Sequence, residues 1–286
     1  MKLPPFEYRS PTTLAEAVAI LAAEGGSARP LAGGQSLLPV LAFRLAAPSI
    51  LVDLRRIPDL RRITIDDKGV HLGAMTRWRD IEDDARLRTA HPLLVAAIAH
   101  VAHYQIRNRG TVGGSLAHAD PATEMPGIAV TCDATVEVMG ASGARAIAAA
   151  DLFVGPLTTS LKADEIITGV RLPPWPQARR WGFEEFSRRR GDYALSAVAV
   201  FYDQDEKGHA RDVHVGVIGA ADTPVRLAEA ERAVNGTTVD DATIAAAAAA
   251  ASQAVDPPDD IHAPAVYRRA LVGTLLERAL KRAAGQ

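Results

Sequence analysis

Residues 29–48 read RPLAGGQSLLPVLAFRLAAP, and a second segment built on the same device, RNRGTVGGSLAHADPATEMPG, occupies residues 107–127. In each segment a Gly-Gly pair is followed by Gln-Ser or Ser and then by an apolar run. Glycine tolerates a positive φ and leaves room for a ligand beside the backbone. Turn amides that point the same way, followed by a helix N-terminus, bind anions. The two segments therefore predict two halves of one phosphate site.

The side chains around these turns narrow the kind of phosphate ligand. Gln35, Ser36, Thr111 and Ser115 can each donate a hydrogen bond to a phosphate oxygen. The triphosphate loop G-x-x-x-x-G-K-[ST] and the dinucleotide fingerprint G-x-G-x-x-G are both missing from the two segments. Neither segment contains lysine, so backbone dipoles would carry the binding, which suits a diphosphate that stays bound. The alternative, that Gly-Gly pairs are only turns, stays open here.

Two acidic residues after the second turn extend this interpretation. Asp120 and Glu124 could hold ribose or ribityl hydroxyls, as carboxylates do in other dinucleotide sites. Together with the diphosphate argument, this points to FAD.

Composition excludes several classes of protein. The 286 residues are 48% hydrophobic and 23% charged, which is ordinary for a globular protein of one to three domains. A formal net charge of −2 gives no reason to expect nucleic acid or an anionic membrane as the partner. The single cysteine, Cys132, excludes an intrachain disulfide and a self-contained iron–sulfur cluster. With no signal-peptide pattern and no apolar run of roughly 18 residues, we expect a cytoplasmic protein without membrane insertion.

The chain divides into three blocks. Residues 1–55 predict the order strand, helix, strand, helix, strand, with a helix that opens at Thr12 or Thr13 and closes at Gly25-Gly26. Residues 56–175 predict a hairpin around Asp66-Asp67-Lys68-Gly69, then a helical stretch over 77–102 that is interrupted at Pro92.

After the second Gly-Gly turn we expect a helix from about residue 121 to 130, and then strands at 134–140 and 164–173. The proline-dense LPPWP at 172–176 marks a boundary. Residues 176–286 predict strands at 194–203 and 210–220, followed by an alanine-rich helix and a helix from about 264 to 281. This alternation of short strands and helices favours an α+β or α/β fold.

Three stretches carry a resemblance to a known family: PLAGGQSLLPVLAFRLAAPSILVDL at 30–54, QIRNRGTVGGSLAHADPATEMP at 105–126 and RRRGDYALSAVAV at 188–200. They resemble the FAD-binding medium subunit of the molybdenum hydroxylases, a group that includes carbon monoxide, N-heterocycle and xanthine dehydrogenases. The resemblance covers essentially the whole chain. It implies an α+β fold: an FAD-binding domain of the vanillyl-alcohol-oxidase type in two lobes, 1–55 and 56–175, and a smaller α+β C-terminal domain, 176–286, that closes over the flavin.

The resemblance also implies roles for individual residues. Residues 32–36, the first glycine motif, and residues 111–115, the second glycine motif, would hold the FAD diphosphate from two sides. Asp120 or Glu124 would meet the ribose or ribityl hydroxyls. The full set of implied FAD-binding residues is Ala32, Gly33, Gly34, Gln35, Ser36, Ile106, Thr111, Gly113, Gly114, Ser115, Asp120, Glu124, Leu161 and Tyr193. Ile106 and Leu161 would pack on the flavin or adenine, and Tyr193 would lie near the isoalloxazine.

Three positions depart from the family pattern. Gln35 and Ser115 stand where many relatives have His and Asn, and both still form hydrogen bonds. Glu185 stands where relatives often carry lysine, so we assign it no cofactor role. A positive charge near the flavin stabilises its reduced anionic form, so the exchange for an acid bears on the redox potential.

By the resemblance, this chain is an electron-transfer subunit of an oxidoreductase and has no catalytic residue of its own. It would take electrons from two [2Fe-2S] clusters of a small iron–sulfur subunit, which receive them from a molybdenum–pterin centre on a large subunit. It would pass them to an external acceptor. The assembly would be a heterotrimer, often doubled. The large subunit would read the substrate, and the first motif is more similar to N-heterocycle dehydrogenases than to the carbon monoxide enzymes.

Other interpretations stay open from the residues alone. A free-standing FAD oxidase of the same fold would need its own substrate pocket, and a phosphate-binding scaffold would purify without flavin absorbance. His100, His103, His118 and Asp120 invite a metal hypothesis, but exposed or capping histidines explain them better, and we predict no metal site. Cys132 lies between a predicted helix and strand, where a buried apolar role is expected.

Overall fold

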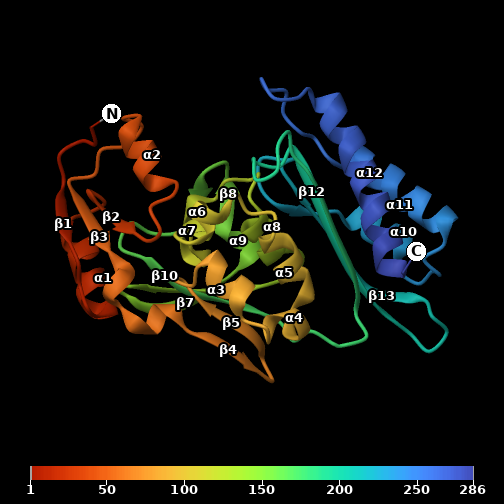
Figure 1. The fold of residues 1–286 in the computed structure, drawn as a ribbon, viewed down its shortest axis with the longest axis horizontal. Helices are drawn as coiled ribbons and strands as arrows, with labels where there is room; N and C mark the ends of the chain where they lie inside the picture. The colour runs from red at the N-terminus through yellow and green to blue at the C-terminus, as the bar shows by residue number, and fades with distance from the viewer. Residues whose placement is uncertain (1, 286) are drawn as a thin grey trace.

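The computed structural model describes residues 2–285. Its strands form sheets of three, five and four strands and a two-stranded ribbon. Figure 1 shows the three sheets following one another across the molecule, with the N-terminal unit at the left and the C-terminal helices at the right. The expected α+β fold class is confirmed, because separate sheets carry helices on their faces.

The N-terminal unit is a parallel sheet with strand order β1-β3-β2. Its elements are β1 (Glu7–Arg9), α1 (Leu14–Ala23), β2 (Ala28–Leu31), α2 (Leu37–Ala42) and β3 (Ile50–Asp53). The predicted order of strands and helices is confirmed. The Thr13 hydroxyl accepts a hydrogen bond from the Glu16 amide at 3.2 Å and caps α1. Gly25, at φ +54°, follows its last turn.

The middle unit is an antiparallel sheet with strand order β4-β5-β10-β6-β7. Its strands are β4 (Ile63–Asp66), β5 (Gly69–Gly73), β6 (Thr135–Gly140), β7 (Gly143–Ala148) and β10 (Ile166–Leu172), and the ribbon consists of β8 (Phe153–Gly155) and β9 (Thr158–Thr159). Two 3-10 turns, η1 (Leu54–Arg56) and η2 (Pro58–Arg61), lead into it. Its helices are α3 (Trp78–Asp83), α4 (Leu87–Ala90), α5 (Pro92–Ile98), α6 (Tyr104–Arg107), α7 (Val112–His118), α8 (Glu124–Thr131) and α9 (Ala149–Leu152).

Most predictions for this unit are confirmed, with shifted boundaries. β4 and β5 form the expected hairpin, and Gly69 in its turn has φ +105°. The helical stretch divides into α3, α4 and α5, the last of which begins at Pro92. The helix expected from about residue 121 begins at Glu124, because Asp120 holds residues 121–123 in a turn. Strand β7 and the ribbon were not expected.

The C-terminal unit is an antiparallel sheet with strand order β11-β12-β13-β14. Its elements are β11 (Arg180–Phe186), β12 (Ser196–Gln204), β13 (Ala210–Ile218), β14 (Val225–Arg226), α10 (Ala228–Val234), α11 (Asp241–Ala254) and α12 (Ala265–Ala284). Two strands and two helices were predicted correctly; β11, β14 and α10 were not. The sequence of β11, RWGFEEF, contains three strand-favouring aromatic residues but no β-branched one, and its glycine and two adjacent glutamates weaken the strand signal. Figure 1 shows the three helices on one face of β12 and β13.

Helix α8 joins the middle and C-terminal units. Gly127 in α8 lies against the side chain of Ile218, and Gly216 in β13 lies against Thr131. At these two positions a side chain on the glycine would collide with its neighbour, so the helix packs very closely on the sheet. One hydrophobic core accordingly runs through both units.

Arg179 strengthens the contact between the middle and C-terminal units. Its guanidinium lies 5.3 Å from the ring centroid of Trp175 and 4.6 Å from that of Phe201, and it forms an ion pair with Asp203 at 2.7 Å. The boundaries proposed above, at residues 55/56 and 175/176, fall between the sheets and stay a proposal. Of the helices formed by residues 2–285, none is both long and apolar enough to cross a membrane.

Candidate functional site

The first glycine motif connects β2 to α2. Gly34 adopts φ +73°, a conformation that favours glycine, and the Gln35 side-chain amide donates to the Gly33 carbonyl at 3.1 Å. Within residues 2–285, the main-chain amides of Gly34, Gln35 and Ser36 donate to no protein acceptor. Three successive free amides before a helix form the anion-binding concavity that the sequence predicts.

The second glycine motif is arranged differently. The Thr111 hydroxyl caps α7 by accepting a hydrogen bond from the Gly114 amide at 3.1 Å. The Gly113 amide donates to the Ala74 carbonyl at 2.8 Å. These two amides are therefore already bonded within the protein. The second motif instead offers open space and the Ser115 hydroxyl.

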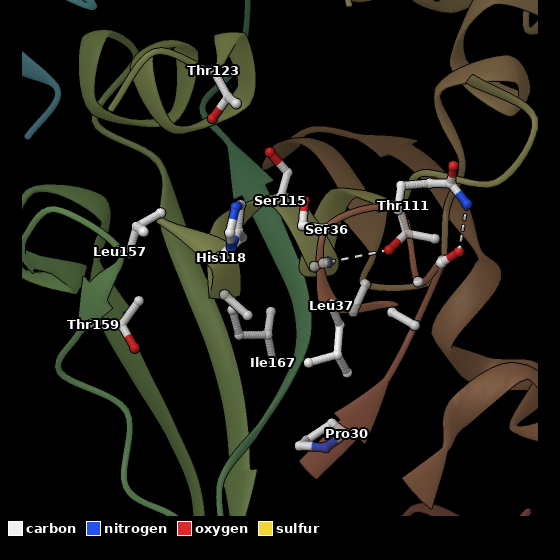
Figure 2. A pocket seen from close by; sticks show the side chains of 18 of the residues that line it. Pro30, Ser36, Leu37, Thr111, Ser115, His118, Thr123, Leu157, Thr159 and Ile167 are labelled. Carbon is white, nitrogen blue, oxygen red and sulfur yellow. Dashed lines mark hydrogen bonds between the residues drawn. The ribbon is translucent and has the colours of Figure 1, made fainter. Parts of the chain in front are cut away.

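The two motifs face one another. A Cβ built on Gly114 would lie 3.5 Å from the Cβ of Ala32 in the first motif. Figure 2 shows the side chains of Ser36 and Ser115 close together, each on its own segment of the site. Among the described residues neither hydroxyl has a hydrogen-bond partner, so both are available to a ligand.

Between the motifs lies a cavity of about 820 Å³. It is large enough for a cofactor-sized ligand. Thirteen of the fourteen predicted site residues line it: Ala32, Gly33, Gly34, Gln35, Ser36, Ile106, Thr111, Gly113, Gly114, Ser115, Glu124, Leu161 and Tyr193. All three units contribute to its wall, because Tyr193 comes from the loop between β11 and β12.

Comparison with known proteins identifies the family. Residues 4–175 match the family model of the FAD binding domain in molybdopterin dehydrogenase, which is more than half of the chain. Residues 181–283 match the CO dehydrogenase flavoprotein C-terminal domain. The chain belongs to the FAD-binding medium subunits of the molybdenum hydroxylases.

Individual relatives of this FAD subunit span nearly its whole length. It is 42% identical to the nicotine 6-hydroxylase medium subunit of Paenarthrobacter nicotinovorans over 280 residues, which covers 98% of each chain. It is 40% identical to the 6-hydroxypseudooxynicotine dehydrogenase complex subunit alpha of the same organism, which covers 99% of this chain and 96% of that one. The structure of carbon monoxide dehydrogenase from Hydrogenophaga pseudoflava matches with a TM-score of 0.96 at 35% identity and covers 100% of this chain and 99% of that one. The expected family, FAD as cofactor and the oxidoreductase class are thereby confirmed.

The residues of the FAD subunit fit the cofactor by their chemistry. A diphosphate needs hydrogen-bond donors, and the first motif provides three free amides beside two free serine hydroxyls. Arg29 from β2 and Lys162 from the segment after β9 also line the cavity, although neither was a predicted site residue. Arg29 lies three residues before the first glycine motif. The adjacency of Lys162 to the predicted Leu161 was the only signal for it.

Asp120 is the one predicted site residue that does not line the cavity. Its carboxylate accepts a hydrogen bond from the Ala122 amide at 2.9 Å, and its carbonyl accepts one from the Thr123 hydroxyl at 2.7 Å. These bonds hold the turn before α8, and Asp120 does not line the cavity. Of the two acidic candidates, Glu124 lines the cavity, and the contact of Asp120 with the cofactor stays a prediction.

Glu124 has an unusual environment for a carboxylate. It is 6% exposed, in the first turn of α8. Burial, reinforced by the charges of Glu185 and Asp120, raises the pKa of Glu124 to about 8. At neutral pH it is therefore a neutral acid that can donate a hydrogen bond into the cavity.

Tyr193 lies at the mouth of the same cavity and is 56% exposed. Partial burial and the nearby carboxylates of Asp120 and Glu124 raise its pKa, so the phenol keeps its proton. Its ring is the large aromatic surface that the C-terminal unit contributes to the site.

Residues considered for other chemistry take structural places. Cys132 is buried after α8, and burial raises the pKa of its thiol to about 12, which makes it unreactive. Among residues 2–285, no group of three or more His, Cys, Asp or Glu side chains has the arrangement of a metal site. His103 and His118 line the cavity, whereas the Nδ1 atom of His100 lies 3.6 Å from Oε1 of Glu185.

Proposed function

We propose that this FAD subunit receives electrons from iron–sulfur clusters of a partner subunit and passes them to an external acceptor. The observation that carries the proposal is the single cavity wall formed by both glycine motifs, in a chain of this family. The chain has one cysteine, and an iron–sulfur cluster needs several cysteine ligands. The clusters and the molybdenum–pterin centre therefore belong to other subunits.

Within the cavity, each motif has its own task. The free amides of Gly34, Gln35 and Ser36 hold the diphosphate, and Ser36 and Ser115 add hydrogen bonds from two sides. Bound FAD supplies the reversible acceptance of two electrons, which can leave one at a time. Glu124 provides a hydrogen-bond donor at neutral pH, which suits a hydroxyl or carbonyl oxygen of the cofactor.

Ile106, Leu161 and Tyr193 provide the apolar and aromatic surface against which flat rings pack. Ile106 and Tyr193 belong to the part of the wall formed by residues 101–103, Ile106 and residues 191–193, where the C-terminal unit meets the middle one. We assign the isoalloxazine to this part because a half-exposed aromatic side chain there leaves a route for an electron acceptor. Leu161 then belongs to the adenine part.

The partners are a large molybdenum-binding subunit and a small iron–sulfur subunit, in a heterotrimer that forms dimers. The nicotine 6-hydroxylase and 6-hydroxypseudooxynicotine dehydrogenase subunits have 42% and 40% identity, whereas two carbon monoxide dehydrogenase medium chains have 37% and 34%. Because the identity to the nicotine-named relatives is higher, we infer that the complex acts on an N-heteroaromatic or similar small molecule. The large subunit selects this substrate.

The test is purification of the chain from its native host with whatever accompanies it. We expect flavin absorbance, release of FAD on acid treatment, and iron and molybdenum in two co-purifying subunits. The substrate preference is tested by reducing this complex with N-heteroaromatic compounds or with carbon monoxide. An active chain that carries FAD without these partners would contradict the proposal and favour a free-standing oxidase.

A further inference from the structure

A buried acid of strand β11 has an unsatisfied oxygen. The side chain of Glu185 is 2% exposed, and among the described residues its Oε2 atom has no hydrogen-bond partner. The Nδ1 atom of the His100 imidazole lies 3.6 Å from Oε1, beyond a good hydrogen bond. A buried oxygen left without a partner is costly, so it calls for a function.

Glu185 lies at a second cavity that adjoins the FAD site. This cavity has a volume of about 380 Å³ and is lined by Ala99, His100, Glu185, Phe186, Ser187, Arg190 and Gly191. Gly191 also lines the large cavity, so the two cavities share a wall. The wall is closely packed, because a Cβ atom built on Gly191 would lie 2.5 Å from the carbonyl oxygen of Ala102. The second cavity is large and polar enough to hold water molecules.

Glu124 lies on the FAD side of this wall. The charge of Glu185 raises the pKa of Glu124, in addition to the larger effect of burial. The acid on each side of this wall is buried: Glu124 is 6% exposed, and the side chain of Glu185 is 2% exposed. His100, with 43% of its side chain exposed, connects Glu185 to solvent.

The charged and titratable groups around the pair come from several elements. Asp120, before α8, and Tyr193, after β11, face Glu124, and Asp192 lies next to Tyr193. Arg190 and His100 face Glu185 across the second cavity. His103 and His118 lie on the wall of the large cavity. Among these titratable and charged groups, only Glu185 has a buried side-chain oxygen without a hydrogen-bond partner.

We propose that Glu124, Glu185 and His100 form a proton-exchange path between the FAD site and solvent. The inference rests on the proposed function, because it matters only if electrons enter this site. When an electron pair arrives from the partner's clusters, negative charge builds up in the cavity. Reduced FAD takes up protons, and Glu124 is the acid of the cavity wall that would deliver one, its O–H bond breaking as the new bond to hydrogen forms on the reduced cofactor.

The path restores the acid after each transfer. A proton from solvent passes by way of His100, the second cavity and Glu185 to the Glu124 carboxylate. No group other than the cofactor is oxidised or reduced, and one proton from solvent balances the one delivered. When the electrons leave for the acceptor, the proton returns by the same route.

The test uses the full chain loaded with FAD and compares Glu124→Gln, Glu185→Gln and His100→Gln with the wild type. Glu184→Gln is the matched control, because Glu184 is the neighbour of Glu185 on β11 but forms an ion pair with Arg282. Two readouts are taken: the FAD midpoint potential between pH 6 and 10, and the infrared band of a protonated carboxyl group in the apoprotein.

In the wild type and the control we expect the slope of potential against pH to change near pH 8, where the carboxyl band also disappears. Glu124→Gln should abolish both features. Glu185→Gln should move both to lower pH, since it removes a neighbouring charge. His100→Gln should leave the potentials unchanged but slow the proton uptake that an indicator dye reports after rapid reduction, by about tenfold.

Three results would overturn the inference. The first is FAD that binds normally but whose midpoint potential varies with pH in the same way in the wild type and in Glu124→Gln. That result would leave the proposed function intact. Another is unchanged proton uptake in both Glu185→Gln and His100→Gln. The third is a wild-type chain that binds no FAD at all, which would overturn the proposed function together with this inference.

Discussion

Gly33 of the first glycine motif lies directly against the main-chain carbonyl of Arg109, just before the second motif. A Cβ atom on Gly33 would overlap that carbonyl and touch Cα of Gly110. The two motifs are therefore in contact, backbone against backbone, although they are far apart in the sequence. This contact sets the distance between the two sides of the FAD site.

Gly33→Ala tests this contact. The added methyl group should push the motifs apart, destabilise the protein by about 1–3 kcal/mol and weaken FAD binding by at least about tenfold. Flavin fluorescence titration of the apoprotein measures the affinity. Gly155→Ala is the control, because a Cβ there meets no atom within 4 Å. Equal affinities for the two variants would show that the contact is unimportant.

Gly34→Val and Gly114→Val test the motifs separately. Position 34 has φ +73°, which a β-branched residue adopts only with strain, and a Cβ on Gly114 would lie 2.8 Å from the Thr111 hydroxyl. Both variants should purify colourless while their far-ultraviolet circular dichroism stays that of the wild type. Full yellow colour in both would contradict the model of a site built from two motifs.

Tyr193→Ala tests the aromatic wall at the cavity mouth. Because Tyr193 is half exposed and contributes no diphosphate contact, FAD should stay bound at full stoichiometry. The rate at which reduced FAD is reoxidised by an artificial acceptor should change severalfold, and Tyr193→Phe should restore it. If stopped-flow traces of the alanine variant match those of the wild type, Tyr193 does not belong to the site.

Glu124 should make the apoprotein less stable as the pH rises. Its pKa is about 8 when folded, against 4.5 ordinarily, so between these values only the folded state holds the proton. The free energy of unfolding then falls with rising pH, by up to ~1.4 kcal/mol per pH unit. Glu124→Gln should flatten this decline in urea titrations at pH 5 to 8. The same slope in both proteins would refute the raised pKa.

His91 should produce the opposite dependence at lower pH. Burial lowers the pKa of its imidazole to about 3, and its Nδ1 accepts a hydrogen bond from the Leu94 amide at 3.2 Å at the start of α5. Below pH 6.5 the unfolded chain gains a proton that the folded chain refuses, so stability falls as the pH falls. His91→Asn keeps a capping side chain and should remove this loss between pH 6.5 and 4. Thermal unfolding at several pH values measures the slope, and a variant as acid-sensitive as the wild type would count against this role.

Local interactions were predictable because neighbouring residues make them. The Thr13 cap, the hairpin at Gly69 and the strands on either side of the first motif all depend on residues a few positions apart. Strand β11 was not predictable in this way, since its glutamates and glycine resemble a loop, and only pairing with β12 and packing under α12 make it a strand.

The same distinction between local and long-range interactions applies to the FAD site. The glycine motifs and their hydroxyls were evident in the sequence by itself, because turn geometry requires those residue types at that spacing. Which acid faces the cavity was decided by tertiary structure: Asp120 folds back on its own turn, while Glu124 enters the site on α8. The approach of Lys162 to the site was likewise decided by long-range packing, and so was the approach of Glu185 to the adjoining cavity, since the segment after β9 and strand β11 are far in sequence from the first motif. A side chain's neighbours across the fold leave no pattern in its own stretch of sequence.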